Sequence, residues 1–389
     1  MYKVKTLNNI KADSLERLDF EKYSVSAEID DPDAIIVRSA KMHETEFNQE
    51  LLCIARAGAG YNNIPIDRCA EKGIIVFNTP GANAEAVKEL VLCALLLSSR
   101  DVLGGIDWVK SIAAEGENIS ALVEKQKAMF AGPELSGKTL GVVGLGAIGA
   151  KIARAATVLG MTVYGYDPYL SVEAAWQLSS EIIQANDLDT IYKNSDYITL
   201  HVPHLESTNN MINKASIAKM KPGIRIVNIA RAELVCDDSI LDALASGQVS
   251  CYVTDFPNEK TSGKAGVIAI PHLGASTPES EDKCVSMACS EIIEYIENGN
   301  LINSVNMAGA YMPRTGDPRV CVIHDNVPEM IAKITGTVSS FGLNIENSVY
   351  ASTKGRLPSY MMIDVDAVPD GLEAALGSIS GVTRVRVLL

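Results

Sequence analysis

Over the first 300 residues, short apolar runs alternate with amphipathic stretches whose apolar positions recur every three or four residues. The helical pattern is clearest over 83–99 and 237–245, and from 277 to about 298. Runs typical of strands lie at 4–7, 34–38, 52–56, 74–78, 140–143, 161–166, 198–202, 224–230, 251–255 and 267–270. Strands that alternate with helices in this way predict parallel sheets, so we expect an α/β protein.

The last 71 residues follow a different pattern. Strands are predicted at 320–324, 344–352, 360–365 and 383–388, and helices at 328–341 and 372–378. This βαββαβ order is that of the split βαβ unit, and we expect a small binding or assembly domain. Prolines and small residues mark 306–318 as a linker before this domain.

A glycine-rich turn in the middle of the chain predicts a dinucleotide site. Gly144, Gly146 and Gly149 follow the strand at 140–143 and open a helix, and Asp167 ends the next strand. The first glycine permits a tight turn, the second lets the backbone approach a pyrophosphate, and the third lets helix and strand pack closely. Asp167 suits a ribose hydroxyl and repels a 2′-phosphate, which favours NAD over NADP. Because the motif lies mid-chain, we expect this domain to interrupt a second α/β domain, with substrate in the cleft between them.

Composition excludes several classes of function. Hydrophobic residues make up 47% of the 389 residues and charged residues 21%, as in an ordinary globular protein. The net charge of −14 argues against nucleic acid or an anionic membrane as the main partner, and no apolar segment is long enough to suggest a membrane span. The eight cysteines form no CxxC pair and the N-terminus shows no secretory signal, so we expect a cytoplasmic protein without a metal site.

Three polar residues follow predicted strands in the second half of the chain: Arg231, Glu259 and His272. The carboxyl ends of the strands in a doubly wound sheet face the ligand crevice. Hydride transfer from a carbinol needs a base for the hydroxyl proton, a cation for the carboxylate and a group that tunes the base, and these three residues can supply them. From spacing alone, a structural Pro-His pair, a surface arginine and a solvated glutamate remain open.

Five short motifs occur in order along the chain. They are IVRSA at 36–40, RAGAG at 56–60, NTP at 78–80, HVP at 201–203 and PHLGAS at 271–276. With the glycine-rich turn they resemble the D-isomer-specific 2-hydroxyacid dehydrogenases over nearly the whole chain, and PHLGAS is characteristic of the phosphoglycerate branch. The resemblance implies a Rossmann-type NAD domain (100–270) inserted into a flavodoxin-like substrate domain (1–99 and 271–305), followed by a ferredoxin-like ACT domain (319–389).

The resemblance also implies a reaction and its residues. The reaction would be NAD-dependent oxidation of 3-phospho-D-glycerate to 3-phosphohydroxypyruvate, the first step of L-serine biosynthesis. The catalytic residues would be Arg231, Glu259 and His272. The cofactor would be bound by Gly144, Gly146, Ala147, Ile148, Gly149, Asp167, Val202, Pro203, Ile229, Ala230, Asp255, Gly274 and Ala275. The anionic substrate would be bound by Arg38, Arg56 and the backbone amides of Ala57, Gly58 and Ala59.

The tail resembles the regulatory ACT domains of that branch. His324, Asn326 and Asn344 stand where such domains bind L-serine between paired copies, which implies an L-serine effector and a homodimer or homotetramer. The helix at 83–99 would add a further subunit contact. A purely structural dimer interface in the tail is the alternative.

The chain departs from the family pattern at several positions. Ala232 replaces the glycine that usually follows the catalytic arginine. The segment before Glu259 is one residue shorter than usual, and Lys260 replaces a proline. In the tail Glu329 stands where a glycine is common, so affinity for serine could be altered or absent.

Two rival functions stay open. One is a reductase of glyoxylate, hydroxypyruvate or another D-2-hydroxy acid, against which Arg38, Arg56 and the tail argue. The other is an NAD-sensing binding protein with vestigial catalysis, against which the intact set of Arg231, Glu259 and His272 argues.

Overall fold

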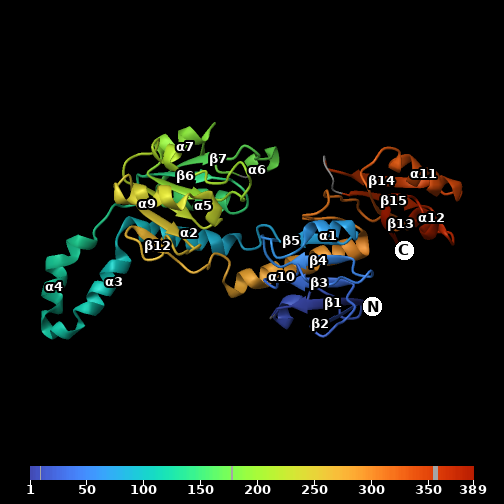
Figure 1. The fold of residues 1–389 in the computed structure, drawn as a ribbon, viewed down its shortest axis with the longest axis horizontal. Coiled ribbons are helices and arrows are strands. Elements are labelled where there is room, and N and C mark those ends of the chain that lie inside the picture. Colours follow the sequence, from blue (N-terminus) through green and yellow to red (C-terminus); the bar gives the residue numbers. More distant parts are fainter. Residues whose placement is uncertain (9, 177, 354–357) are drawn as a thin grey trace. The chain divides into compact units, whose positions relative to one another are not determined.

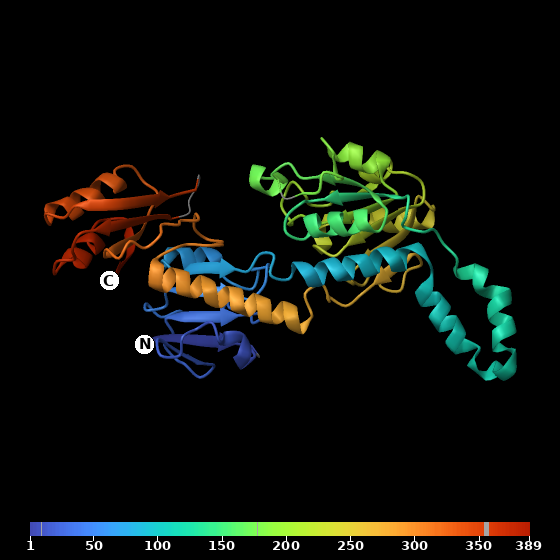
Figure 2. The same ribbon diagram turned by 180° about the vertical axis from the view of Figure 1, so that it is seen from behind.

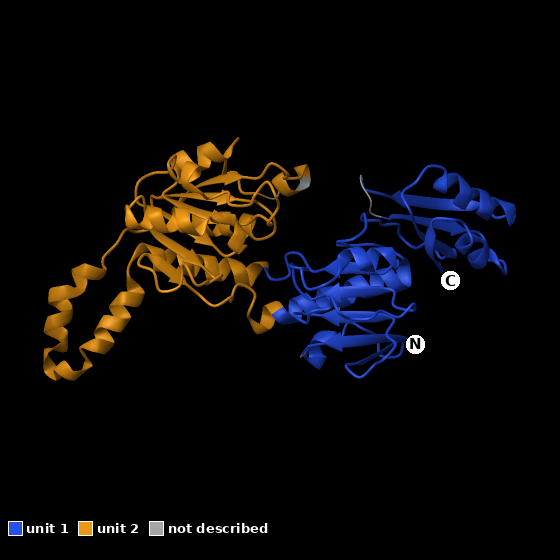
Figure 3. Ribbon diagram, in the orientation of Figure 1, with its two compact units in different colours: residues 1–83, 281–389 blue, residues 84–280 orange. Residues whose placement is uncertain are grey.

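The computed structural model describes residues 1–8, 10–176, 178–353 and 358–389. The chain forms two compact units, residues 1–83 with 281–389 and residues 84–280 (Figure 3). The second unit interrupts the first along the sequence, because the chain leaves the first unit after residue 83 and returns to it at residue 281.

A five-stranded parallel sheet forms the amino-terminal part of the first unit. Its order, β2-β1-β3-β4-β5, is that of flavodoxin-like folds and confirms the expected domain type. Its strands are β1 (Tyr2–Leu7), β2 (Tyr23–Ser26), β3 (Ala34–Val37), β4 (Cys53–Arg56) and β5 (Ile75–Asn78), and its helices are η1 (Ala12–Leu15), α1 (Ile66–Glu71) and α10 (Pro278–Asn298). The edge strand β2 is missing from the predicted strands because it buries only Tyr23.

Helix α10 begins where its sequence predicts. The Thr277 hydroxyl accepts a hydrogen bond from the Ser280 amide (3.1 Å) at the helix start, and Pro278 is the first helical residue. Its apolar face packs against the five-stranded sheet through Cys284, Val285, Ala288, Cys289, Ile292, Tyr295 and Ile296.

The second unit contains a seven-stranded parallel sheet of order β12-β11-β10-β9-β6-β7-β8. The chain order reverses between β6 and β9, as in a Rossmann fold, and confirms the predicted class. Its strands are β6 (Thr139–Val143), β7 (Thr162–Tyr166), β8 (Ile183–Gln184), β9 (Tyr197–Leu200), β10 (Ile224–Asn228), β11 (Val249–Thr254) and β12 (Val267–Ala269). Its helical segments are α2 (Ala84–Ser99), α5 (Gly149–Val158), α6 (Val172–Trp176), α7 (Leu188–Asn194), α8 (Lys214–Ile217), η4 (Ala232–Leu234) and α9 (Asp237–Ala245).

A helical arm, residues 102–130, projects from the second unit (Figure 1) and is seen from behind in Figure 2. It comprises α3 (Val102–Ser111), η2 (Ala113–Asn118), α4 (Ile119–Gln126) and η3 (Lys127–Phe130), and none of these segments has a buried residue. The ring of Trp108 packs against that of Phe130, with centroids 5.5 Å apart. The arm therefore exposes apolar side chains, among them Val102, Leu103, Ile106, Val109 and Met129.

The tail forms an antiparallel sheet of order β14-β15-β13-β16. Its elements are β13 (Arg319–His324), α11 (Met330–Ser340), β14 (Ile345–Ala351), β15 (Ser359–Val365), α12 (Leu372–Gly377) and β16 (Val382–Leu388), so the predicted βαββαβ order is confirmed. One face of the sheet packs on its two helices. The other face joins the core of the amino-terminal part through Cys321, Ile323, Tyr360, Met362 and Leu388.

Arginines of the tail hold it against the end of α10. Arg319 donates to the carbonyl of Asn298 (2.7 Å) and pairs with Asp364 (2.7 Å), and both charged side chains are fully buried. Arg386 donates to the carbonyl of Tyr295 (3.0 Å). The last carbonyls of a helix lack partners within the helix, and these guanidinium groups supply donors for them.

The segment 306–318 is not the simple linker that its prolines and small residues predict. Met307, Ala310 and Met312 are buried in the same core. Asn306 is fully buried, and its side chain bonds the backbone of Ile74 (2.8 Å) beside β5. The prediction is wrong because prolines and small residues can also line a packed segment, which local composition does not reveal.

Candidate functional site

The glycine-rich turn between β6 and α5 has the geometry that its sequence predicts. Gly144 has φ +91°, and a Cβ there would lie 2.5 Å from the carbonyl oxygen of His201. A Cβ on Gly149 would lie 1.9 Å from the Gly144 oxygen. Both glycines are therefore required by the fold itself. Gly146 differs, because a Cβ there would meet no atom within 4 Å, so its glycine leaves open space beside the turn.

The amino end of α5 offers backbone donors toward that open space. Its N-cap residue, Ile148, gives the first turn no side-chain hydrogen bond, and Gly146 and Ala147 are exposed. Uncapped amides at a helix N-terminus are suited to an anion such as a pyrophosphate. Asp167, at the tip of β7, is fixed beside the turn because its two carboxylate oxygens accept the amides of Leu145 and Tyr169 (both 2.9 Å).

A buried acceptor lies at the carboxyl end of β11. Asp255 is 1% exposed, and its Oδ2 accepts the Gly274 amide (3.2 Å). Its Oδ1 is buried and has no hydrogen-bond partner in the described part of the chain. Burial raises the pKa of Asp255, whereas the nearby charges of His272 and Arg231 lower it. An amide donor of a ligand, such as a carboxamide, would satisfy the remaining oxygen.

His272 and Arg231 lie near this carboxylate. His272 is exposed, and its ring packs against Phe256 with centroids 4.8 Å apart. Arg231 is also exposed, and its backbone carbonyl accepts a hydrogen bond from the Asn228 side chain (2.8 Å) at the end of β10. Sequence reasoning missed Phe256, although it directly follows Asp255.

Glu259 is not joined to this group by a hydrogen bond or ion pair among the described residues. It is exposed, in a turn closed by Asn258, whose side-chain oxygen accepts the amides of Lys260 (3.0 Å) and Thr261 (2.9 Å). No hydrogen bond joins Glu259 to His272 among the described residues. Carboxylates of this kind often reach their histidine only when a substrate is bound. The structure thus brings Arg231, Asp255 and His272 together and leaves Glu259 in the neighbouring loop.

The remaining predicted cofactor residues, and His201 beside them, are apolar or neutral. The predicted cofactor residues Val202, Ile229, Ala230 and Ala275 are buried or half-buried, and Pro203 is exposed. Burial lowers the pKa of His201 to about 3, and its Nε2 lies 2.8 Å from the Thr199 hydroxyl. A neutral, hydrogen-bonded His201 is suited to a wall and not to proton transfer.

Of the two predicted substrate arginines, Arg38 is paired within the first unit. Its Nη2 lies 2.6 Å from Oε1 of Glu281 in the first turn of α10, and each side chain is about one-third exposed. Its backbone is held by Asn8, whose side-chain oxygen accepts the amides of Arg38 (3.1 Å), Ser39 (3.0 Å) and Ala40 (3.1 Å). Sequence reasoning missed both Asn8 and Glu281.

The Arg56 side chain folds over the loop that follows β4. Gly58 has φ +142°, and a Cβ there would lie 1.4 Å from Nη1 of Arg56, so only glycine leaves room for the guanidinium. The predicted amide cradle is smaller than expected. The Ala57 amide already donates to Val37 O (2.8 Å) and the Gly58 amide to the Thr79 hydroxyl (2.6 Å). Within the described residues no such bond engages the amide of Ala59.

The three predicted effector residues do not meet within one chain. His324 is buried, with Nδ1 2.7 Å from Asp325 O and Nε2 without a hydrogen-bond partner among the described residues. Asn326, just after β13, donates to Thr353 O (3.2 Å). Asn344 precedes β14, which begins at the opposite end of the sheet from His324. A ligand held by all three would need a second copy of the tail.

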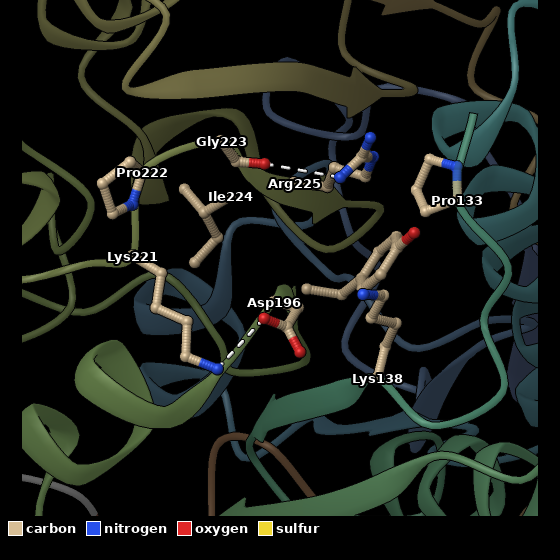
Figure 4. A pocket seen from close by; sticks show the side chains of 9 residues that line it. Pro133, Lys138, Asp196, Lys221, Pro222, Gly223, Ile224 and Arg225 are labelled. Atoms are coloured by element: carbon tan, nitrogen blue, oxygen red, sulfur yellow. Dashed lines mark hydrogen bonds and ion pairs between the residues drawn. The ribbon is translucent and has the colours of Figure 1, made fainter. Parts of the chain in front are cut away.

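A polar pocket at the other edge of the seven-stranded sheet is not a candidate. Figure 4 shows the side chains that line it. It lies where β9 and β10 begin, whereas the glycine-rich turn and Asp255 lie where strands end. Its Lys221 pairs with Asp196 (3.0 Å), and its Arg225 donates to Ser98 O (2.8 Å) at the end of α2. These interactions give the pocket's charges a structural role.

Within the described ranges, no three His, Cys, Asp or Glu side chains are grouped so that they could hold a metal ion. Among the helices of those same ranges, none combines the length and apolar character needed to cross a bilayer.

Comparison with known proteins matches the sequence and the fold to one family. Residues 94–275 match the NAD binding domain of the D-isomer specific 2-hydroxyacid dehydrogenases. The hydroxypyruvate reductase of Thermotoga maritima is 37% identical over 273 residues, which are 67% of this chain and 84% of that protein. The D-3-phosphoglycerate dehydrogenase of Pongo abelii is 34% identical over 313 residues, which are 77% of this chain and 56% of that protein.

The chain thus spans little more than half the length of the phosphoglycerate dehydrogenases of Pongo abelii and Rattus norvegicus. Among solved structures, NAD+-bound 3-phosphoglycerate dehydrogenase of Entamoeba histolytica superposes with a TM-score of 0.62 and 25% identity, covering 78% of this chain and 98% of that one. The chain belongs to the D-isomer-specific 2-hydroxyacid dehydrogenase family.

Proposed function

We propose that the protein is an NAD-dependent dehydrogenase that oxidises 3-phospho-D-glycerate to 3-phosphohydroxypyruvate, the entry step to L-serine. The observation that carries the proposal is the grouping of Arg231 and His272 around Asp255, at the carboxyl ends of neighbouring strands of the sheet that also carries the open Gly146 turn. The names of the matched phosphoglycerate dehydrogenases support the choice of substrate.

The residues present fit an NAD molecule. The open space at Gly146 and the uncapped start of α5 suit the pyrophosphate, and Asp167 suits the ribose hydroxyls. The unpartnered Oδ1 of Asp255 suits the amide donor of the nicotinamide carboxamide. When bound, the cofactor supplies the acceptor for the hydride from the substrate's C2.

The chain's own residues manage the proton and the charge. His272 takes the hydroxyl proton, a role worth about 10²–10⁴-fold in rate. Glu259 then stabilises the imidazolium, which requires its loop to approach His272 in the substrate complex. Arg231 orients the substrate carboxylate and the developing keto oxygen through its guanidinium fork.

Arg38 and Arg56 receive the anionic groups of the substrate, with the Ala59 amide as a further donor. Glu281, which pairs with the Arg38 guanidinium in the structure, competes with the substrate for it. Two arginines on adjacent strand ends would give a chain with net charge −14 the local positive charge that a phosphorylated acid needs.

Turnover across a small panel of D-2-hydroxy acids and their 2-oxo partners tests this function. We expect NADH formation to be fastest with 3-phospho-D-glycerate when the product is trapped. Faster reduction of hydroxypyruvate or glyoxylate would instead favour the reductase reading, which matches the Thermotoga maritima relative over more of its length. NADH binding without any turnover would favour an NAD-sensing protein.

We further propose a cytoplasmic homodimer or homotetramer that binds L-serine in its tail. The exposed apolar side chains of the arm give the chain a surface suited to a second copy. Helix α2, the further subunit contact expected from the sequence, packs one face within its own unit and exposes Cys93 and Leu96 on its other side. Serine inhibition of the wild type and of Asn326→Ala tests the effector site, and equal inhibition of both would remove it.

A further inference from the structure

Helix α10 carries one buried carboxyl group that no proposed step uses. Glu291 is 3% exposed, and its Oε1 accepts a hydrogen bond from the Asn303 side chain (2.8 Å). Its Oε2 is buried without a hydrogen-bond partner among the described residues. Burial raises the pKa of Glu291 to about 8, so the group is largely protonated near neutrality. Burying a carboxyl group with one unsatisfied oxygen lowers the stability of the folded protein. This cost indicates that the side chain has a role.

Asn303 connects Glu291 to the end of β5. It has φ +56°, a left-handed conformation that asparagine tolerates better than most residues but that is still costly. The Asn303 carbonyl accepts the Asn78 amide (3.3 Å). The Asn78 side chain in turn donates to the carbonyl of Ala59 (2.6 Å). An unbroken series of hydrogen bonds therefore runs from Glu291 to the loop at 56–60.

We propose that Glu291 is a positioning residue for the substrate loop, 56–60, acting through Asn303 and Asn78 on the Ala59–Gly60 peptide. The identity of this loop as a substrate loop rests on the proposed function. By holding the Asn303 side chain, Glu291 keeps the Asn303 carbonyl aimed at Asn78. This fixes the orientation of the peptide next to the Ala59 amide, which the substrate carboxylate would meet.

The neighbouring backbone is held independently, so the effect of Glu291 is local. The Asn306 side chain accepts the Val76 amide (2.8 Å) and donates to Ile74 O (2.8 Å). Val305 also donates its amide to Val76 O (2.8 Å). Loss of Glu291 would release the turn at Asn303 and leave this pairing with β5 in place.

Steady-state kinetics of Glu291→Ala and Glu291→Gln test the proposal. We expect Glu291→Ala to raise KM for the hydroxy acid about tenfold with kcat changed less than twofold, about 1.4 kcal/mol of binding free energy. Glu291→Gln should restore KM, because an amide keeps the acceptor for Asn303. The matched control is Glu297→Ala. It removes from the same helix a carboxylate that accepts a hydrogen bond from the Tyr23 hydroxyl (2.8 Å). Unchanged KM in Glu291→Ala would overturn the proposal.

A second measurement does not depend on turnover. Hydrogen exchange of the amides at 58–60 should accelerate at least threefold in Glu291→Ala, but not when Asn303→Gly is already present. Equal exchange in wild type and Glu291→Ala would overturn the proposal even if no substrate were found. If exchange is faster in Glu291→Ala but the wild type turns over no hydroxy acid, the coupling is upheld and only the proposed function fails.

Discussion

Two glycines that follow strands, one in each unit, differ in what occupies the space where a side chain would lie. At Gly146 of the second unit the space that a Cβ would fill is empty. At Gly58 of the first unit that space is filled by the Arg56 guanidinium, 1.4 Å from the Cβ position. The first glycine therefore keeps a place open for a ligand, whereas the second accommodates the protein's own side chain.

The same difference extends to the groups around each glycine. In the second unit, the start of α5 beside Gly146 is uncapped, and Asp255 at the end of β11 keeps an oxygen without a partner among the described residues. Around Gly58, two of three amides are already donated and Arg38 is paired with Glu281. The second unit, the nucleotide half, is thus preorganised for its ligand. In the first unit, the proposed substrate half, a ligand would have to replace internal partners.

The largest expected effect is on kcat, and it comes from a residue of the second unit whose loss should leave cofactor binding unchanged. His272→Ala should lower kcat about 10²–10⁴-fold, because the hydroxyl proton loses its acceptor. The Kd of NADH, measured by fluorescence titration, should stay within about twofold, since the Gly146 turn and Asp255 are untouched. His204→Ala, at an exposed histidine bonded to Asn209 (3.3 Å), is the control. A His272→Ala enzyme with wild-type kcat would show that another group is the base.

The next prediction concerns the first unit and the pH dependence of its free energy of unfolding. Burial raises the pKa of Glu291 from its ordinary value of 4.5 to about 8 in the folded protein. Between these values the folded chain holds a proton that the unfolded chain releases, so the free energy of unfolding falls as pH rises. The slope is at most about 1.4 kcal/mol per pH unit, and it vanishes above the folded pKa.

Denaturant unfolding at several pH values from about 5 to about 9 measures this slope. Glu291→Gln should flatten it, because the amide does not titrate. Glu297→Gln, which changes a partly exposed carboxylate of the same helix, should leave most of it. An identical slope in wild type and Glu291→Gln would mean that Glu291 is ionised in the folded state.

A smaller effect compares two glycines of the same turn. Gly144→Ala should destabilise the protein by about 1–3 kcal/mol, because its φ of +91° and the nearby His201 oxygen leave no place for a methyl group. Gly146→Ala should leave Tm unchanged and raise the Kd of NADH about tenfold, since its methyl group enters only the open space. If Gly146→Ala binds NADH as the wild type does, the open space is not where the cofactor lies.

The parts of this comparison that sequence predicts are the local ones. Strand, glycine turn and helix follow each other along the chain, so residues 140–167 suffice to predict the turn at Gly146 and its neighbour Asp167. Glu281, the partner of Arg38, lies 243 positions away along the sequence. Arg386 of the tail and Tyr295, whose carbonyl accepts its hydrogen bond, are 91 positions apart. Periodicity and composition carry no record of such contacts, which explains why 306–318 was expected to be a linker and Ala57 a free donor.

The smallest expected effect tests whether Glu281 competes with the substrate for Arg38. Their pair is about one-third exposed and 2.6 Å long, and exposed ion pairs contribute about 0–1 kcal/mol. If the substrate must displace Glu281, Glu281→Gln should lower KM by up to about fivefold, with less gain at high salt. Glu279→Gln, at an exposed position of the same turn, controls for the change in charge. A raised KM in Glu281→Gln would mean that Glu281 orients Arg38 for the substrate, and the substrate half would then be as preorganised as the nucleotide half.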